Sequence, residues 1–298
     1  MELHQTRITL ANGIELDVVD EGPRDAPALI FLHGFPENHR TWRHQIAHLS
    51  DRYRCIAPDQ RGYRGSSRPE GVEAYDASEL IGDIFHLAAA LGLKEFTIVG
   101  HDWGGAIAWG VALRGQEMGM VVRAIIANAP HPLIFQKLLY TNHNQREASQ
   151  YIRDFRDTAN DALVREQGLG ALLERVTNWQ NDDAMEPAER DLLRQDWSNG
   201  EAAIAMLNWY RASAIDVPDM EAPFALPEGW EAPTLPNLTI PTLVIWALDD
   251  TALPAENLDG LDTVVENMTL VEVPNCGHFV PWEAPDAVNA AMDAFLKP

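Results

Sequence analysis

The chain has 298 residues, of which 46% are hydrophobic and 22% charged, and its formal net charge at pH 7 is −23. The length suits one large domain or a domain with an inserted segment, and the acidic balance argues against nucleic acid and anionic membranes as partners, because binding phosphate requires clustered Lys and Arg. No apolar run is long enough to span a bilayer, and the N-terminus lacks the basic region and apolar core of a signal peptide.

The first part of the chain alternates predicted strands and helices. A hairpin is expected to turn at Asn12-Gly13. Apolar runs of the kind that a parallel sheet buries on both faces then predict four strands, at residues 27–34, 53–59, 95–100 and 121–130. Helices are predicted between these strands, over residues 39–50, 76–92 and 104–113. Asp76, followed by Glu79 three residues on, is predicted to cap the second helix.

The pattern changes in the second half of the chain. Residues 130–236 are polar, acidic and helical in character, strands return at 240–250 and 268–278, and a last helix follows Pro285. Strands alternating with helices predict a mostly parallel sheet with helices on both faces. We expect residues 1–129 and 237–298 to form this core, and residues 130–236 to form a helical cap over its C-terminal edge, where open α/β sheets bind ligands.

Two cysteines, Cys55 and Cys276, are present. Two cysteines do not make a disulfide framework and neither lies in a metal-ligand spacing, so we expect free thiols in a reducing, cytoplasmic compartment. The histidines show no metal spacing either, and the chain contains no glycine-rich phosphate loop. We therefore expect neither a metal nor a cofactor.

The sequence GHDWG, residues 100–104, lies between a predicted strand and a predicted helix. Glycines at such a turn let the backbone reverse sharply, so that the middle side chain projects from the edge of the sheet. Many hydrolases carry a serine nucleophile at this place, whereas this chain has Asp102. The alternative is that Asp102 only caps the helix that follows.

Two further side chains follow predicted strands in the second half. His278 comes after the last strand, in PNCGHFVPWE, and Asp250 after the preceding one, in IWALDDTALP. Nucleophile, acid and histidine in this chain order form one of the known catalytic triads. Asp249 is a rival for the acid, but the spacing of Trp246, Asp250 and Pro254 favours Asp250.

Taken together, HGFPE, DQRGYRGSSRP, GHDWGG, the acid frame and CGHFVPWE resemble the motifs of the α/β-hydrolase superfamily and, within it, of the epoxide hydrolases. The resemblance covers nearly the whole chain and implies the α/β-hydrolase fold without the extra N-terminal domain of two-domain members. The chain departs from the family at Arg64-Gly65, where Gly-Asp is common, and at Ala247, where glycine is usual. Neither change removes a catalytic group.

In this fold the loop after the third strand supplies an amide of the oxyanion hole. The expected donors are the backbone N–H groups of Phe35 and Trp103. Pro36 has no N–H, and a cis bond before it is expected to aim Phe35. The same three residues are predicted to line the substrate pocket.

An aspartate nucleophile restricts the chemistry. A carboxylate that attacks a saturated carbon leaves an ester on the enzyme. His278, oriented by Asp250, can then activate water against the carbonyl of Asp102, and the oxyanion hole stabilises the resulting intermediate. A serine would instead leave an unreactive ether. Asp102 therefore favours displacement at carbon, either epoxide opening or carbon–halogen cleavage.

The leaving group separates these two reactions, because an epoxide oxygen requires an acid. Tyr210 in LNWYR matches the second cap tyrosine of soluble epoxide hydrolases, and Tyr151 in SQYIRDF fits the position of the first. A phenol can donate a hydrogen bond and then a proton to the ring oxygen. Tyr140 is the alternative to Tyr151, and simple packing of the cap is the alternative role for each tyrosine.

We therefore predict an epoxide hydrolase that converts a small apolar epoxide and water to a vicinal diol through an ester on Asp102. A haloalkane or haloacid dehalogenase with the same nucleophile is the alternative, and a non-catalytic ligand receptor on the same fold is a remote one. Haloalkane dehalogenases also carry a tryptophan directly after the nucleophile, so Trp103 does not decide between the two activities. We expect a monomer or a homodimer.

Overall fold

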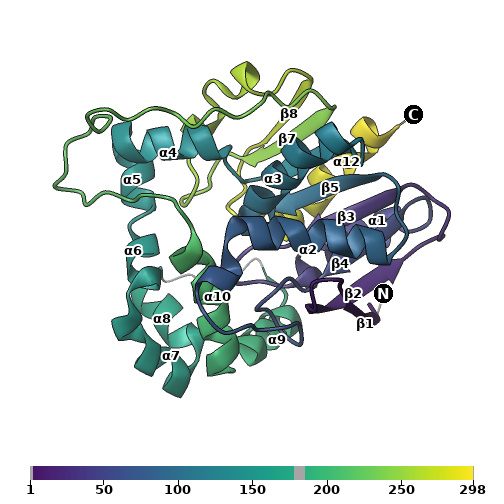
Figure 1. Cartoon of the computed structure of the whole chain (residues 1–298), viewed down its shortest axis with the longest axis horizontal. Coiled ribbons are helices and arrows are strands. Elements are labelled where there is room, and N and C mark those ends of the chain that lie inside the picture. Colours follow the sequence, from purple (N-terminus) through teal and green to yellow (C-terminus); the bar gives the residue numbers. More distant parts are fainter. Residues whose placement is uncertain (1–2, 178–184, 298) are drawn as a thin grey trace.

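The computed structural model describes residues 3–177 and 185–297, which form a central sheet with helices around it (Figure 1). The strands of this sheet are β1 (Gln5–Thr9), β2 (Glu15–Glu21), β3 (Ala28–Leu32), β4 (Arg54–Pro58), β5 (Phe96–His101), β6 (Val121–Ala127), β7 (Thr242–Ala247) and β8 (Met268–Val273). Their order across the 8-stranded sheet is β1-β2-β4-β3-β5-β6-β7-β8. The β1–β2 hairpin is antiparallel, β2 pairs antiparallel with β4, and β3 to β8 run parallel.

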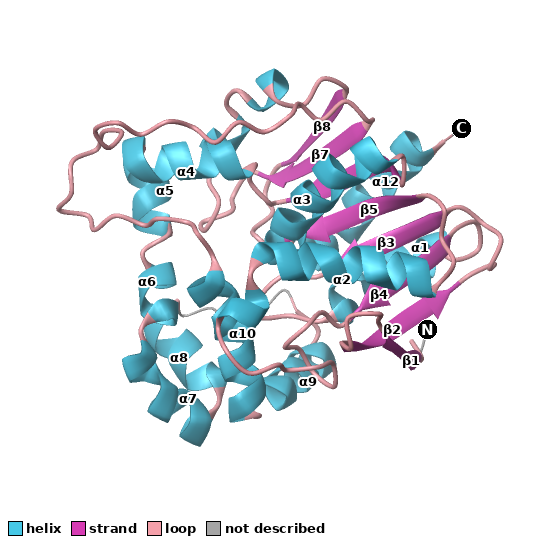
Figure 2. Cartoon of the chain, viewed as in Figure 1, coloured by secondary structure: helices cyan, strands magenta, loops and turns pink. Residues whose placement is uncertain are grey.

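Helices cover both faces of the sheet, as Figure 2 shows. They are α1 (Arg43–Leu49), α2 (Ala77–Ala90), α3 (Asp102–Met118), α11 (Val280–Glu283) and α12 (Pro285–Leu296). Side chains alternate along each strand: in β3, Ile30 and Leu32 join the apolar core under α2 and α3, whereas Leu29 and Phe31 join the core under α1 and α12. Burial on both faces explains why these strands are continuous apolar runs in the sequence.

The remaining helices all lie between β6 and β7 in the chain. They are α4 (Pro132–Thr141), α5 (His143–Ala148), α6 (Tyr151–Arg156), α7 (Asp161–Gln167), α8 (Leu169–Val176), α9 (Pro187–Trp197) and α10 (Gly200–Ala212). In Figure 1 this teal and green group stands beside the sheet, at the ends of the strands where α3 begins. The predicted cap includes residues 178–184, which lie outside the described residues.

The predicted mostly parallel sheet flanked by helices is confirmed, and so is the hairpin at Asn12-Gly13. Two details differ. The helix predicted over residues 39–50 starts as a 3₁₀ turn, His39–Trp42, before α1. Asp76 does occupy the N-cap of α2, but its side chain makes no capping hydrogen bond. In the part of the chain that the structure describes, no helix is both long and apolar enough to cross a membrane.

Candidate active site

Asp102 lies at the sharp turn between β5 and α3. Its φ is +51°, in the left-handed region that few residues other than glycine adopt. The turn brings α3 so close to β3 that a side chain at Gly104 would collide with the carbonyl groups of Leu32 and His33. Since Asp102 is the first residue of α3 and His101 is the N-cap, the alternative of a helix-capping aspartate does not describe the geometry.

The two oxygens of the Asp102 carboxylate have different partners. Oδ1 accepts a hydrogen bond of 2.7 Å from the backbone N–H of Phe35, and Oδ2 lies 3.4 Å from Nε2 of His278. Burial favours the neutral acid, but the hydrogen bond and charge of His278 and the backbone N–H of Trp103 outweigh it and lower the pKa of Asp102. The carboxylate is therefore ionised and points one oxygen at the expected oxyanion donors.

His278 is held between two carboxylates. Its Nδ1 lies 2.7 Å from Oδ2 of Asp250. Asp250 is buried, whereas the rival Asp249 is exposed. Burial lowers the pKa of His278, but the charge of Asp250 and the hydrogen bonds to Asp102 and Asp250 raise it well above the ordinary histidine value. Nδ1 therefore donates to Asp250, and Nε2 faces the candidate nucleophile.

Asp250 is itself fixed by neighbours that the sequence did not point to. Asn128 donates to Oδ2 of Asp250 at 2.7 Å and accepts from the backbone N–H of Ala247 at 2.8 Å. The backbone N–H groups of Ala252 and Leu253 donate to Oδ1 at 2.8 and 2.9 Å. The one signal for Asn128 in the sequence is its place at the end of β6, at the same sheet edge as the candidate triad residues.

The loop that carries His278 is held from two sides. Glu283 accepts from the backbone N–H groups of Gly277 and Phe279, at 2.7 and 2.8 Å. His101 Nε2 lies 2.8 Å from the carbonyl oxygen of His278, and because a carbonyl only accepts, Nε2 carries the proton. His101, the residue before the candidate nucleophile, had no role indicated by a sequence pattern. Its ring supports the candidate base through the backbone of His278.

Phe35 is held by the loop that follows β4. His33 Nδ1 contacts the carbonyl oxygen of Gly34 at 2.9 Å, while its Nε2 accepts from the backbone N–H of Gln60 at 3.1 Å. The Gln60 side chain donates to the carbonyl oxygen of His33 at 2.6 Å. The predicted cis bond between Phe35 and Pro36 is confirmed.

A cavity of about 380 Å³ opens at this site. The candidate catalytic side chains Asp102, His278, Tyr151 and Tyr210 line it together with the expected pocket residues Phe35 and Pro36. A smaller cavity of about 80 Å³ adjoins the same aspartate and tyrosines and is otherwise apolar. Trp103 lines this smaller cavity, so the three residues predicted to contact the substrate all line one of the two cavities. Asp250 lies behind His278 and lines neither cavity.

The two tyrosines lie side by side, with ring centroids 6.2 Å apart. Burial, followed by nearby negative charge, raises the pKa of both phenols above the ordinary value, so both keep their protons. The Trp103 ring lies beside Tyr210, with ring centroids 5.1 Å apart, and it lowers the pKa of Tyr210 by less than burial raises it. Tyr140, the alternative, instead donates to Asp216 at 3.0 Å and lines neither cavity.

The two cysteines line neither cavity. Cys55 and Cys276 are buried free thiols, and burial raises the pKa of each to about 12. Among residues 3–177 and 185–297, no three His, Cys, Asp or Glu side chains gather in a group that could hold a metal ion.

Comparison with known proteins agrees with this geometry. Residues 27–285 match the family model described as alpha/beta hydrolase fold. Epoxide hydrolase 1 of Caenorhabditis elegans is 31% identical over 95% of this chain and 68% of its own length. A solved structure of one of the novel epoxide hydrolases from metagenomes of hot environments is 69% identical, with a TM-score of 0.97 over 100% of this chain and 99% of the other.

A further solved structure is the Bacillus megaterium epoxide hydrolase in complex with an inhibitor. It is 31% identical, with a TM-score of 0.85 over 98% of this chain and 99% of that one. Fold, family model and relatives all agree. The chain belongs to the epoxide hydrolase family of the α/β-hydrolase superfamily.

Proposed function

We propose that this enzyme converts an epoxide and water to a vicinal diol through a covalent ester on Asp102. The observation that supports this best is one shared cavity, in which an ionised carboxylate and two protonated phenols face the same space. The carboxylate can attack a saturated carbon, and the phenols can protonate the oxygen that leaves it.

The first step opens the ring. Oδ2 of Asp102, the oxygen that does not accept from Phe35, forms a bond to an epoxide carbon while the carbon–oxygen bond of the ring breaks. Tyr210 and Tyr151 donate hydrogen bonds to that oxygen, and one of them supplies its proton. An alkoxide is a stronger base than a phenolate, so the developing alkoxide takes the proton even though burial raises the pKa of both phenols.

The second step hydrolyses the ester. Once Asp102 is an ester, its negative charge is gone, so one of the two carboxylates that raise the pKa of His278 no longer does so. The imidazolium therefore loses its Nε2 proton, which restores the phenol that protonated the ring oxygen. The neutral imidazole then takes a proton from water, whose oxygen bonds to the ester carbon. The negative charge on Oδ1 is stabilised by the N–H groups of Phe35 and Trp103. The ester carbon–oxygen bond breaks, and the diol leaves with the proton from His278. The Asp102 carboxyl then gives its own proton to His278, which restores the ionised carboxylate and the protonated histidine.

The lining of the cavities indicates an uncharged substrate. Among the described residues, no Lys or Arg lines either cavity. The larger one carries the exposed carboxylates of Glu147 and Asp154, and the smaller one presents apolar side chains such as Phe135 and Ile152. We propose a small apolar epoxide as substrate, residues 130–236 as the cap that encloses it, and a cytoplasmic location.

The replacement His278→Gln tests this function. The variant should form the ester with styrene oxide and fail to hydrolyse it, so that intact-protein mass rises by the mass of the whole epoxide and peptide mapping places the adduct on Asp102. His48→Gln, which changes an exposed histidine paired with Asp293, is the matched control and should turn over without an adduct. Halide release from haloalkanes by the wild type, with no diol from any epoxide, would refute the proposal in favour of a dehalogenase.

A further inference from the structure

Arg64 has a backbone conformation that an arginine seldom adopts. Its φ is +47°, in the left-handed region where a side chain with a Cβ is strained and glycine is not. Its side chain is 28% exposed and extends between the loop after β4 and the C-terminal end of α9. A strained residue is maintained when its side chain makes contacts that glycine could not make, and those contacts are specific here.

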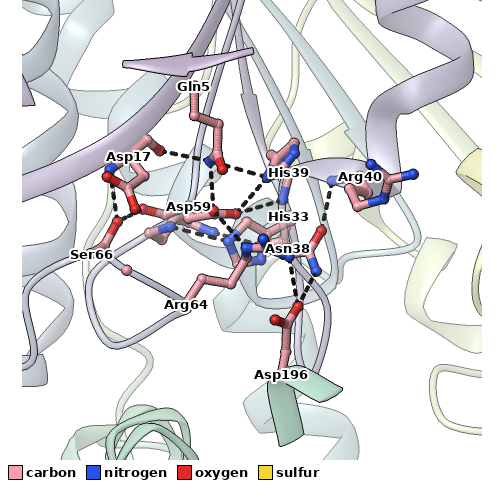
Figure 3. Close-up of polar contacts among 12 residues, drawn as sticks. Gln5, Asp17, His33, Asn38, His39, Arg40, Asp59, Arg64, Ser66 and Asp196 are labelled. Atoms are coloured by element: carbon pink, nitrogen blue, oxygen red, sulfur yellow. Dashed lines mark hydrogen bonds and ion pairs between the residues drawn. The ribbon is translucent and has the colours of Figure 1, made fainter. Parts of the chain in front are cut away.

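The Arg64 guanidinium bridges two carboxylates, as Figure 3 shows. Nε lies 3.3 Å from Oδ2 of Asp59, and Nη1 lies 2.8 Å from Oδ2 of Asp196. Asp59 belongs to the loop after β4, whereas Asp196 belongs to α9. One cation therefore joins the sheet to a helix of the predicted cap.

That cation favours the ionised form of both carboxylates, more strongly for Asp196 than for Asp59. Asp59 is fully buried, and although burial opposes ionisation, the charge and hydrogen bond of His39, with further help from His33 and Arg64, lower its pKa to about 2. Burial raises the pKa of Asp196, and the negative charge of Asp59 adds to that effect while Arg64 counters it. Without Arg64 the two negative charges would repel each other and push α9 away from the loop.

The end of α9 rests on the segment that carries the proposed oxyanion donor. Trp197 donates to the carbonyl oxygen of Pro36 at 2.7 Å, and Asn38 donates to Asp196 at 2.9 Å. Farther along, Arg40 pairs with Glu189 of the same helix. The chain from Pro36 to Arg40 is thus held against α9 immediately after Phe35.

We propose that Arg64 is a positioning residue, which fixes α9 against the Pro36–Arg40 segment and thereby holds the Phe35 N–H in place for ester hydrolysis. The inference rests on the function proposed above. In the first step charge leaves the Asp102 carboxylate, so the Phe35 hydrogen bond weakens. In the second step negative charge develops on Oδ1, the atom that this N–H contacts. Loosening the segment therefore slows the second step more than the first.

The test measures the rates of ester formation and ester hydrolysis separately in a set of variants. Arg64→Gly removes the cation and suits a φ of +47°, so the protein should fold with a melting temperature near that of the wild type. Asp196→Asn and the double variant Arg64→Gly/Asp196→Asn remove the repulsion. Arg52→Ala, which deletes an exposed arginine paired with Asp51 and Asp293, is the control.

Rapid quench with styrene oxide and intact mass gives the rates of ester formation and ester hydrolysis. In Arg64→Gly we expect hydrolysis to slow about tenfold, below the roughly 10²–10³-fold loss for deleting an oxyanion donor, and formation to change by less than about threefold. The ester should then accumulate. The double variant should recover part of the hydrolysis rate, and Arg52→Ala should match the wild type.

An unchanged ratio of the two rates in Arg64→Gly, an equal loss in both steps, or strictly additive effects of the two substitutions would overturn the positioning role. If Arg64→Gly gives no folded protein, Arg64→Lys should show a smaller increase in the ratio of ester formation to ester hydrolysis. An unchanged ratio in Arg64→Lys would overturn the positioning role too. A wild type that forms neither ester nor diol would instead refute the proposed function itself.

Discussion

At the scale of single residues, the two oxygens of Asp102 and the two nitrogens of His278 each face a different partner. Oδ1 of Asp102 faces Phe35 and Oδ2 faces His278, while the two nitrogens of His278 face Asp102 and Asp250. This arrangement leaves Oδ2 of Asp102 to attack the epoxide carbon. It keeps Oδ1 beside the Phe35 N–H, where negative charge develops during ester hydrolysis. The roles of nucleophile and base follow from these contacts, and they can be tested one side chain at a time.

Removing the phenols should affect the first step. We expect Tyr210→Phe and Tyr151→Phe each to slow ester formation, and the double variant to lose about 10²–10⁴-fold, the usual contribution of general acid catalysis. Rapid-quench measurement of the ester in single turnovers checks this. Tyr140→Phe, which removes a hydroxyl bonded to Asp216 away from the cavities, should leave the rate of ester formation unchanged. Normal ester formation in the double variant would contradict the acid role.

The raised pKa of His278 should make stability depend on pH. Because the folded-state pKa lies well above the ordinary histidine value of 6.5, the stabilisation is complete below pH 6.5 and is lost as pH rises through the folded pKa, with a slope of up to about 1.4 kcal/mol per pH unit. The free energy of unfolding of the wild type should therefore fall, relative to that of His278→Gln, as pH rises above 6.5. Denaturant titrations measure it, and a difference that grows with pH would be the wrong sign.

At the scale of elements, the close packing of α3 on β3 sets the position of Asp102. A Cβ at Gly104 would meet the carbonyl groups of Leu32 and His33, which are backbone and cannot move aside easily. The glycines of the turn are therefore required by this approach of helix to strand as well as by the turn itself.

Two glycine-to-alanine substitutions in helices test that packing. We expect Gly104→Ala in α3 to destabilise the fold by more than about 2 kcal/mol, through overpacking against backbone. Gly82→Ala in α2 has nothing within 4 Å of the added atom, so it should stabilise by about 0.5–1 kcal/mol. Free energies of unfolding compare the two, and equal effects of both substitutions would contradict the packing argument.

The sheet could be predicted from the sequence because its strands are buried on both faces and read as apolar runs. The proposed triad could be assembled from the sequence because each of its residues follows a strand in a recognisable order. Asn128 and Glu283 could not, since both act on backbone or carboxylate groups that lie near them only after folding. Arg64 was noted as a departure from the family, but its partner Asp196 is 132 residues away and lies on α9, so no local pattern connects them.

At the scale of the whole molecule, the chain carries a net charge of −23, and part of this negative charge lies in the lining of the larger cavity. Glu147 and Asp154 line the larger cavity and are exposed. In the described residues, no hydrogen bond or ion pair engages the Asp154 carboxylate, and Glu147 pairs at 3.8 Å with the exposed His143. These two carboxylates would repel a negatively charged substrate, and the described lining residues include no Lys or Arg to compensate.

This charge should appear in substrate preference. At low salt, kcat/KM for an epoxide with a carboxylate substituent should be about threefold to tenfold lower than for a neutral epoxide of similar size, because the interaction of two solvent-exposed charges is worth at most about 1 kcal/mol. Salt or the double variant Glu147→Gln/Asp154→Asn should narrow the gap. Asp219→Asn, an exposed carboxylate outside both cavities, is the control, and a preference for the anionic epoxide would contradict the account.

The central claim is that Asp102, and not water, attacks the epoxide. A single turnover in H₂¹⁸O with enzyme in excess over styrene oxide tests it most directly. The account predicts that the first diol carries no ¹⁸O and that the label appears in the peptide containing Asp102, because water attacks the ester carbon. Label in the diol of the first turnover, with none in that peptide, would contradict it.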